Sequence, residues 1–408
     1  MGAAFSSLRL RDPNPELLGL PWELPLADWP VDRLQFRALP VGPSRHLVRF
    51  LETGSGLVAL KEEPVEIADR EYDILRSLED AGLPAVIPMG VAAAPARDAA
   101  ILVTRYLANS FQYRRLLSRV LPGPGHLRDQ LLDAMAGLLV ELHGEGIYWG
   151  DCSLANTLFR RDGDKVQAYL VDAETGERHP ELSDGQRAYD LEVLVENVAF
   201  GLADLAAAQG RDDLFDDALA AAETVRDRYQ ALWDELHAEI EVGADERFAM
   251  AGRVRRINEL GFAVDEIQLL PGQAGRLRMR VAVTNRRFHV HEMERLTGRR
   301  ALEGQARLLL NDLREYGAWL ERAEGRHLAL TESGARWEAE VFEPTLLRLA
   351  PSIGPDEDAI QAYCDVLETK WLRSEQAGRD IGLQSALEAY LAAGAPAPEV
   401  GESVVAGP

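Results

Sequence analysis

The sequence predicts an α+β protein, and three features of its apolar pattern support that fold class. Between residues 34 and 107, apolar residues form short runs separated by turn residues, which is typical of β-strands. Residues 127–143 and 189–241 instead carry apolar residues at helical spacing. A β-hairpin pattern follows at residues 262–284, and helical segments continue to about Leu391. We therefore expect a β-rich N-lobe, an α-rich C-lobe, and an α-rich C-terminal domain with a β-hairpin.

The composition excludes several broad classes of protein. The chain has 408 residues, 67 of them acidic and 44 basic, so its formal net charge is -23. Such a surface repels polyanions, which excludes general binding of the whole surface to nucleic acid or anionic lipid. With 47% hydrophobic residues, the chain can bury one or two large cores and is not disordered as a whole.

Neither the cysteines nor the N-terminal residues indicate secretion. Cys152 and Cys364 are too few and too far apart to form the disulfide framework of a small secreted domain. Residues 1–10 lack a basic start followed by an apolar run. No stretch reaches the roughly 18 continuous apolar residues of a membrane span. We expect a soluble, cytoplasmic protein without a membrane span, and the sequence does not indicate its oligomeric state.

These patterns divide the chain into five segments. Residues 1–33, rich in Pro, Leu and Trp, are expected to be an extension that packs on a larger body. The N-lobe is predicted at residues 34–107 and the C-lobe at residues 108–241. The C-terminal domain is predicted at residues 242–393, and a flexible Pro/Gly/Ala-rich tail at residues 394–408.

Local patterns predict the main elements of the N-lobe. Residues 46–51 and 57–60 are apolar runs that predict the two strands of a β-hairpin. Residues 65–80 place their apolar side chains on one helical face, and Gly82 is expected to end that helix. Residues 99–103 predict a further strand.

Lys61 stands out against the composition of the chain. Only three of the 44 basic residues are lysines, at positions 61, 165 and 370, and the others are arginines. Lys61 directly follows the apolar strand at residues 57–60. We interpret it as a functional residue.

Two carboxylates and one amide lie at predicted strand and loop ends. Asp151 and Asn156 follow the long helix that ends near His143, and an apolar strand comes after them. Asp172 ends another apolar strand, residues 168–171. This set suits phosphoryl transfer, in which one carboxylate orients the attacking hydroxyl while the other, with the amide, holds Mg²⁺ against the phosphates.

These segments resemble the protein-kinase-like fold. Leu142–Phe159, with Gly150 before Asp151, is similar to its catalytic loop in the form seen in small-molecule and sugar kinases. Val171–Glu174 resembles the metal-binding Asp motif, and Leu57–Lys61 resembles the strand that bears the ATP-phosphate lysine. The resemblance covers roughly residues 34 to 240 and is closest to the lipopolysaccharide-kinase-like (Kdo/heptose kinase-like) branch.

The resemblance implies ATP and Mg²⁺ as cofactors and a role for each residue of the set. Lys61, held by Glu71, is expected to grip the phosphates. Asn156 and Asp172 are expected to bind Mg²⁺. Asp151 is expected to orient the acceptor hydroxyl and take its proton late in the reaction.

Two further segments are implied to bind the nucleotide. Residues 101–107 resemble the hinge strand, where Arg105 and Leu107 would offer backbone hydrogen bonds to adenine. The phosphate-covering loop at residues 39–46 has one Gly where three are common, so its grip is expected from Ser44, Arg45 or backbone amides.

The segment also departs from protein kinases. Gly150 replaces the Arg that usually receives an activation-loop phosphate, so control by such phosphorylation is not expected. Ser153 replaces a lysine usual in Ser/Thr kinases, which favours a small-molecule substrate over a protein. Ala173–Glu174 replaces the usual Phe-Gly.

One further residue resembles the kinase pattern: Asp190 corresponds to the buried Asp that braces the catalytic loop.

Several neighbouring residues are given structural interpretations. Glu62, Glu63 and Glu66 are expected on a solvated face. His143 is expected to be a structural histidine at a helix end, and Cys152 a small packed residue.

The C-terminal half resembles a different family. The chain from Met1 to about Ala393 is similar to an actinobacterial family of unknown function that joins a kinase-like half to its own C-terminal domain. Residues 305–313 and 374–380 resemble that family's C-terminal motifs. This resemblance implies no activity.

The residues Arg276, Arg278 and Arg280 alternate along a predicted strand in the basic stretch from Arg253 to Arg300. Either they bind an anionic partner, or this face docks onto the acidic kinase-like half.

The leading function is an ATP- and Mg²⁺-dependent phosphotransferase acting on a hydroxyl of a small-molecule or glycan-like acceptor. The alternative is a pseudokinase, a nucleotide-binding scaffold whose Arg-rich domain binds a regulatory or nucleic-acid partner.

Overall fold

The computed structural model describes residues 7–11, 15–41, 45–94, 98–117, 125–243, 246–273, 276–354 and 357–395. The chain forms two compact units. The first contains Met1–Pro124, Leu131–Phe159 and Ala168–Tyr229, and the second contains Gly125–Gln130, Arg160–Gln167 and Gln230–Pro408. The predicted α+β class is confirmed. The five segment boundaries stay a prediction, and most of the predicted tail lies outside the described residues.

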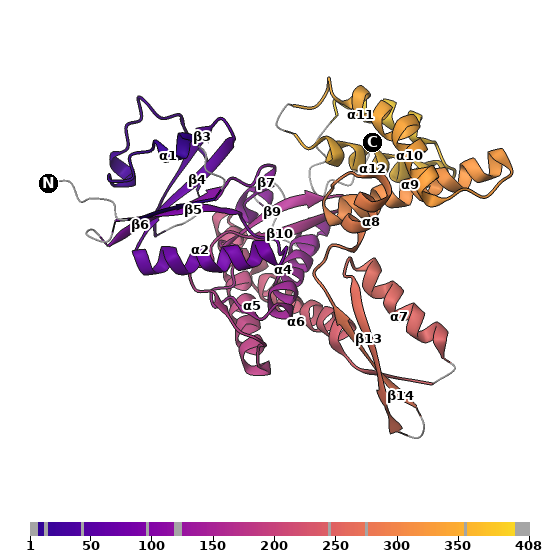
Figure 1. Cartoon of the computed structure of the whole chain (residues 1–408), viewed down its shortest axis with the longest axis horizontal. Helices are drawn as coiled ribbons and strands as arrows, with labels where there is room; N and C mark the ends of the chain where they lie inside the picture. Colours follow the sequence, from indigo (N-terminus) through magenta and orange to yellow (C-terminus); the bar gives the residue numbers. More distant parts are fainter. Residues whose placement is uncertain are drawn as a thin grey trace. The chain divides into compact units, whose positions relative to one another are not determined.

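A six-stranded antiparallel sheet forms the N-lobe, in the order β1-β5-β6-β4-β3-β2. Figure 1 labels four of its strands, β3 to β6. Its strands are β1 (Ser7–Leu10), β2 (Phe36–Arg37), β3 (Leu47–Thr53), β4 (Gly56–Glu63), β5 (Pro88–Ala94) and β6 (Ala99–Arg105). The predicted hairpin is confirmed as β3 and β4, which pair from Thr53 and Gly56 across a two-residue turn. That turn is shorter than expected because both strands extend past their apolar runs.

The predicted helix is α2 (Val65–Asp80), which packs against β5 and β6 of this sheet. Its apolar face is buried, including Ile74, Leu75 and Leu78. The chain leaves the helix through Gly82, whose φ of +70° favours glycine.

The N-terminal extension packs on the sheet, as expected. It contains α1 (Pro15–Leu18) and a 3₁₀ turn, η1 (Leu26–Asp28). Trp22 and Trp29 are buried with Leu60 in one apolar cluster. The sequence pattern did not predict that this segment also supplies β1 at the edge of the sheet.

Short strands and long helices form the C-lobe. The helices are α3 (Tyr113–Leu117), α4 (His126–Gly144), α5 (Asp184–Ala208), η3 (Asp212–Leu214) and α6 (Phe215–His237). The strands form two small sheets, β10-β9-β7 and β11-β8. They are β7 (Ser110–Phe111), β8 (Ile147–Tyr148), β9 (Thr157–Asp162), β10 (Lys165–Leu170) and β11 (Glu177–Arg178). The N-lobe is joined to β10 where the Val86 N–H donates to the Leu170 carbonyl over 2.9 Å.

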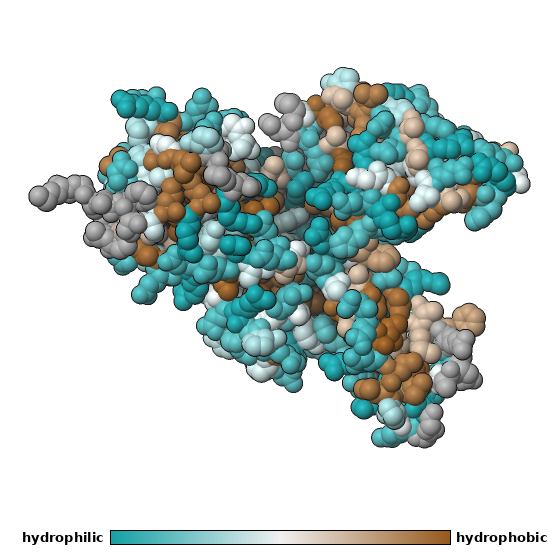
Figure 2. Space-filling model, viewed as in Figure 1, coloured by the Kyte–Doolittle hydropathy of each residue, from teal (hydrophilic) through white to brown (hydrophobic). Residues whose placement is uncertain are grey.

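The second unit contains the predicted hairpin and a helical bundle. The hairpin strands β13 (Val264–Pro271) and β14 (Leu277–Val283) form a sheet with β12 (Ile240–Val242) in the order β12-β14-β13, and α7 (Arg247–Glu259) contacts β13. Figure 2 shows apolar surface along this hairpin, where Ile267 and Leu269 are exposed. The helices that follow are α8 (Phe288–Thr297), α9 (Glu303–Glu324), α10 (Leu330–Trp337), the π-helical turn η5 (Glu338–Phe342), α11 (Glu343–Leu349), α12 (Ala359–Ala377) and α13 (Leu383–Ala392).

Trp337, Phe342 and Tyr363 form the centre of the bundle's core. Among the described helices, none combines the length and apolar character needed to cross a bilayer. Cys152 and Cys364 are both buried as free thiols.

Candidate active site

Lys61 lies near the end of β4, where the alternation of the strand directs its side chain away from the core side that holds Leu60. Its Nζ lies 2.8 Å from Glu71 Oε2, 3.0 Å from Glu63 Oε2 and 3.2 Å from Asp172 Oδ2. Glu71 reaches it from the buried face of α2. The structure thus brings together three residues that the sequence predicted as one site, Lys61, Glu71 and Asp172.

The charges in this cluster shift one another's protonation. Burial opposes the charge of Lys61, yet the carboxylates of Glu71, Asp172 and Glu63 raise its pKa above the ordinary value. Burial raises the pKa of Glu71 to about 8, and the carboxylates of Glu63 and Asp172 add to this effect while Lys61 opposes it. Lys61 therefore stays charged at neutral pH.

Asp151 and Asn156 face each other across the predicted catalytic loop. Asn156 Nδ2 donates to the Asp151 main-chain oxygen and to Asp151 Oδ2, both over 3.0 Å. The Ser153 hydroxyl accepts from the Asn156 N–H over 3.2 Å. Because both amide hydrogens point to Asp151, Asn156 Oδ1 is the atom that remains to coordinate a cation.

Asp190 braces this loop, as predicted. It is fully buried on α5, and its carboxylate accepts from the Trp149 N–H over 2.7 Å and from the Gly150 N–H over 2.8 Å. His143 is a structural histidine, as expected: its Nε2 lies 3.1 Å from Asp190 Oδ2, and its Nδ1 lies 2.8 Å from the Tyr229 hydroxyl. Burial lowers the pKa of His143, and the hydrogen bond to Asp190 opposes this effect.

The backbone explains why glycine precedes Asp151. Gly150 has φ of +82°, and a Cβ there would lie 3.2 Å from the Thr175 carbonyl oxygen. The Thr175 hydroxyl also donates to the Trp149 carbonyl over 2.7 Å. An arginine at position 150 would have to adopt a left-handed backbone in tight contact with Thr175.

Asp172 and the two residues after it are held to both lobes. The Ala173 N–H donates to Glu71 Oε1 over 3.3 Å, and the Glu174 N–H donates to Asp172 Oδ1 over 3.1 Å. The Val171 N–H donates to the Asn156 carbonyl over 3.0 Å. The metal-binding pair predicted from the sequence, Asn156 and Asp172, is therefore joined through the main chain.

The two main-chain N–H groups predicted to contact adenine differ in whether they already have a hydrogen-bond partner. The Leu107 N–H has no hydrogen-bond partner among the described residues, so it can donate to a ligand. The Arg105 N–H is already bonded to the Ile87 carbonyl over 2.8 Å.

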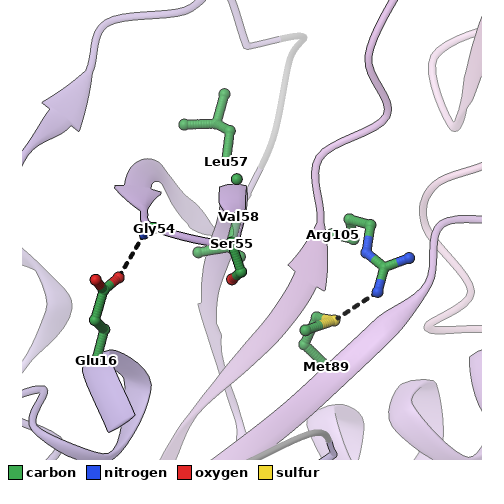
Figure 3. A pocket seen from close by; sticks show the side chains of 8 residues that line it. Glu16, Gly54, Ser55, Leu57, Val58, Met89 and Arg105 are labelled. Carbon is green, nitrogen blue, oxygen red and sulfur yellow. Dashed lines mark hydrogen bonds between the residues drawn. The ribbon is translucent and has the colours of Figure 1, made fainter. Parts of the chain in front are cut away.

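The Arg105 side chain does not lie with Lys61. Arg105 pairs with Val58, whose side chain lies on the opposite face of β4 from Lys61. There it lines a cavity of about 400 Å³ in which Glu16 bonds Gly54, and its Nη2 lies 3.8 Å from Met89 Sδ (Figure 3). This cavity lies on the other side of the sheet from the Lys61 cluster.

The phosphate-covering loop is described in part. Ser44 lies outside the described residues. Arg45 Nη2 donates to Glu174 Oε1 over 2.7 Å, although four-fifths of the arginine side chain is exposed. Arg45 therefore contacts the segment that follows Asp172.

The expectation of a solvated Glu63 was wrong. Its side chain is fully buried, because the two-residue period of β4 places it on the same face as Lys61. Two residues that the sequence interpretation missed lie beside it: one ligand atom from each of His46, Glu63 and Glu174 lies within 4.8 Å of the others. The strand period was the available signal for Glu63, whereas sequence spacing gives no signal for His46 or Glu174.

The strand arginines of the second unit are partly ion-paired. Arg276 Nη2 lies 3.1 Å from Glu246 Oε2, and Arg278 Nη1 lies 3.2 Å from Glu239 Oε2. In the described part of the chain, Arg280 forms no ion pair. Carboxylates that flank β12 thus form ion pairs with two of the three arginines.

Comparison with known protein families divides the chain in two. Residues 58–210 match the Lipopolysaccharide kinase (Kdo/WaaP) family. Residues 231–394 match a Domain of unknown function (DUF4032). The resemblance to a lipopolysaccharide-kinase-like half joined to a separate C-terminal domain is confirmed.

Among solved structures, that of WaaP in complex with acyl carrier protein matches this chain with 21% sequence identity and a TM-score of 0.35. The match covers 62% of this chain and 99% of that one. No curated protein sequence matches this chain.

Proposed function

We propose that this protein is an ATP- and Mg²⁺-dependent phosphotransferase that acts on a hydroxyl of a small-molecule or glycan-like acceptor. The observation that carries the proposal is the contact of Lys61 with both Glu71 and Asp172. This pairing joins the phosphate-gripping lysine, its helix partner and the metal-binding carboxylate of a phosphotransferase. The match of residues 58–210 to the lipopolysaccharide kinase family supports the same reaction class.

The donor atoms present fit Mg²⁺. Asn156 offers its amide oxygen, and Asp172 offers a carboxylate whose side chain is 28% exposed, so both supply the oxygen ligands that this ion prefers. When bound there, Mg²⁺ would neutralise phosphate charge. Lys61 would add a fixed positive charge, held in place by the buried carboxylate of Glu71.

Asp151 is the residue that we assign to contact with the acceptor hydroxyl. Asn156 holds its carboxylate and main-chain oxygen, while Asp190 fixes the preceding turn through Trp149 and Gly150. As the acceptor oxygen bonds to the terminal phosphorus and the bond to ADP breaks, Asp151 takes the hydroxyl proton. Ser153, in place of a lysine, favours a small or sugar-like acceptor over a protein.

The Asp151→Asn variant tests this assignment. It keeps the shape of the side chain and removes its ability to take a proton, so turnover should fall on the order of 10² to 10⁴ fold. Nucleotide affinity should persist or increase slightly, because one negative charge near the phosphates is lost. Labelled ATP, Mg²⁺ and a small-molecule extract measure turnover through labelled product, and titration calorimetry measures ATP affinity.

Two further variants complete the design. Lys61→Ala should weaken both ATP affinity and turnover, because its charge acts on the phosphates in the ground state and in the transition state. Asp32→Asn, at an exposed carboxylate of the N-terminal extension, is the matched control and should change neither. If the wild type binds ATP without any turnover, the pseudokinase alternative is the better account. Full turnover in Asp151→Asn would instead overturn the role assigned to Asp151.

A further inference from the structure

His46, Glu63 and Glu174 converge from three separate segments of the N-lobe and the loop after β10. His46 directly precedes β3, Glu63 ends β4, and Glu174 follows Asp172 by two positions. His46 Nε2 lies 3.3 Å from Glu174 Oε2, and one ligand atom of each of the three residues lies within 4.8 Å of the others. Ligand atoms bound to one divalent ion at about 2.0–2.2 Å have similar separations.

Glu63 contributes a buried carboxylate with one oxygen that has no partner. Glu63 is 3% exposed, and its Oε1 accepts no hydrogen bond. Oε2 lies 3.0 Å from Lys61 Nζ as an ion pair, whereas Oε1 has no such contact. A buried carboxylate oxygen without a partner is costly, so the site calls for a further positive group.

The charged groups around the cluster also indicate a missing positive charge. Two cations, Lys61 and the largely exposed Arg45, contact four carboxylates: Glu63, Glu71, Asp172 and Glu174. When these six groups are ionised and His46 is neutral, the cluster carries two negative charges in excess, and a proton on Glu71 reduces the excess to one. A divalent cation would balance the excess.

The donor types decide which cation fits. Carboxylates suit Mg²⁺, Ca²⁺ and Mn²⁺, whereas imidazole suits transition metals such as Zn²⁺. We propose that His46, Glu63 and Glu174 bind a divalent transition-metal ion, of the Mn²⁺ or Zn²⁺ type, at a site separate from Asn156 and Asp172. Arg45 orients the ligand carboxylate from outside by donating to Glu174 Oε1 over 2.7 Å.

Mn²⁺ binding to the full-length protein, without nucleotide, tests the site. Excess Mg²⁺ should displace Mn²⁺ from the all-oxygen site at Asn156 and Asp172, but not from a site with an imidazole ligand. In an Asp172→Asn background, one Mn²⁺ per chain should remain bound in excess Mg²⁺. Pulsed electron paramagnetic resonance of that ion should show coupling to a histidine ¹⁴N nucleus.

Two ligand variants and two matched controls identify the residues. His46→Ala should abolish the ¹⁴N coupling, and Glu63→Gln should weaken Mn²⁺ affinity at least about tenfold, since even outer partners of metal ligands cost that much. The controls are His291→Ala and Glu66→Gln, which change exposed residues and should leave both signals unchanged.

Unaltered Mn²⁺ affinity in Glu63→Gln, or a bound ion without ¹⁴N coupling, would overturn the proposal. The contacts of Glu174 with Arg45 and His46 would then only close the phosphate-covering loop. Because binding is measured without nucleotide and without turnover, this result is independent of whether the protein is an active phosphotransferase.

Discussion

Glu71 lies where burial, a neighbouring cation and neighbouring carboxylates all act on the protonation of one side chain. It is 1% exposed on α2, bonds Lys61 through one carboxylate oxygen and accepts the Ala173 N–H through the other. The carboxylates of Glu63 and Asp172 lie on the same lysine. Lys61 therefore stabilises the charge of Glu71, whereas the loss of water and the nearby carboxylates of Glu63 and Asp172 destabilise it.

The pKa of Glu71, raised to about 8 by burial and by its carboxylate neighbours, predicts the pH dependence of stability. Between its ordinary value of 4.5 and about 8, the folded chain holds a proton that the unfolded chain has lost. Stability should therefore be highest at the acidic end of this window and fall as pH rises, by about 1.4 kcal/mol per pKa unit at most. Urea unfolding at about pH 5 and about pH 8 measures the fall.

Glu71→Gln should flatten this pH dependence, because the amide does not titrate. Glu66→Gln, on the exposed face of the same helix, is the control and should retain the wild-type fall. An equally steep fall in Glu71→Gln would show that another group is responsible.

At the scale of elements, the hairpin of β9 and β10 connects Asn156 to Asp172. Its tip, residues 160–167, belongs to the second unit. There the Gly163 N–H donates to Gln361 Oε1 over 2.9 Å, and Gln361 Nε2 donates to the Gly163 carbonyl over 2.8 Å. The two predicted metal ligands thus stand at the base of a hairpin whose tip is held by α12.

A second contact holds the same tip at the start of α9. The Asp162 carboxylate accepts from the Gly304 N–H over 2.9 Å and from the Gln305 N–H over 2.8 Å, as a helix N-cap residue would. The approach is so close that a Cβ on Gly304 would lie 2.2 Å from the Asp162 carbonyl oxygen. Gly304 is therefore required by packing, although it lies within a helix.

Gly304→Ala should destabilise the protein by about 1–3 kcal/mol, because the added methyl group forces apart two main-chain segments. Gly137→Ala in α4 is the matched control, since a Cβ there meets no atom within 4 Å. In that helix interior the alanine should stabilise by about 0.5–1 kcal/mol. Chemical denaturation compares the two, and equal effects of the same sign would contradict this account of the hairpin tip.

At the scale of the whole molecule, the two units are not consecutive in sequence. The second unit takes residues 125–130 and 160–167 from within the kinase-like region. In it, Arg160 Nη2 lies 2.8 Å from Asp358 Oδ2, and Arg161 Nη2 lies 2.7 Å from Asp365 Oδ1. Removal of the C-terminal half therefore deprives the hairpin tip of its partners.

A truncated chain of residues 1–238 should be less stable than the full chain and more readily cleaved at residues 160–167. A loss of ~2 kcal/mol would lower its Tm by about 4–8 °C. Scanning calorimetry and limited proteolysis measure both effects. Arg160→Ala with Arg161→Ala in the full chain should reproduce part of the loss, and a truncated chain with an unchanged Tm would refute the prediction.

The sequence by itself determined several helices and hairpins, although not β1, and the order of the predicted site residues. Helix α2, the β3–β4 hairpin and the β13–β14 hairpin follow from local apolar periods and turn residues, which act within a few positions of the chain. The bracing role of Asp190 followed from the resemblance to the protein-kinase-like fold, because the residue comes after the catalytic loop in the order that the resemblance implies.

The tertiary structure alone decided which side chains share a buried environment. Glu63 looked solvated because its neighbours in sequence are charged, but the sheet and the loop after β10 enclose it with Lys61 and Glu174. Arg105 was expected to offer a backbone hydrogen bond to adenine, and its N–H is bonded to the Ile87 carbonyl instead. Its register with Val58 directs its side chain to the other face of the sheet. Burial and long-range contacts depend on segments that are far apart in the chain. A local pattern such as the strand period therefore gives the face on which a residue lies, but not the groups that cover it.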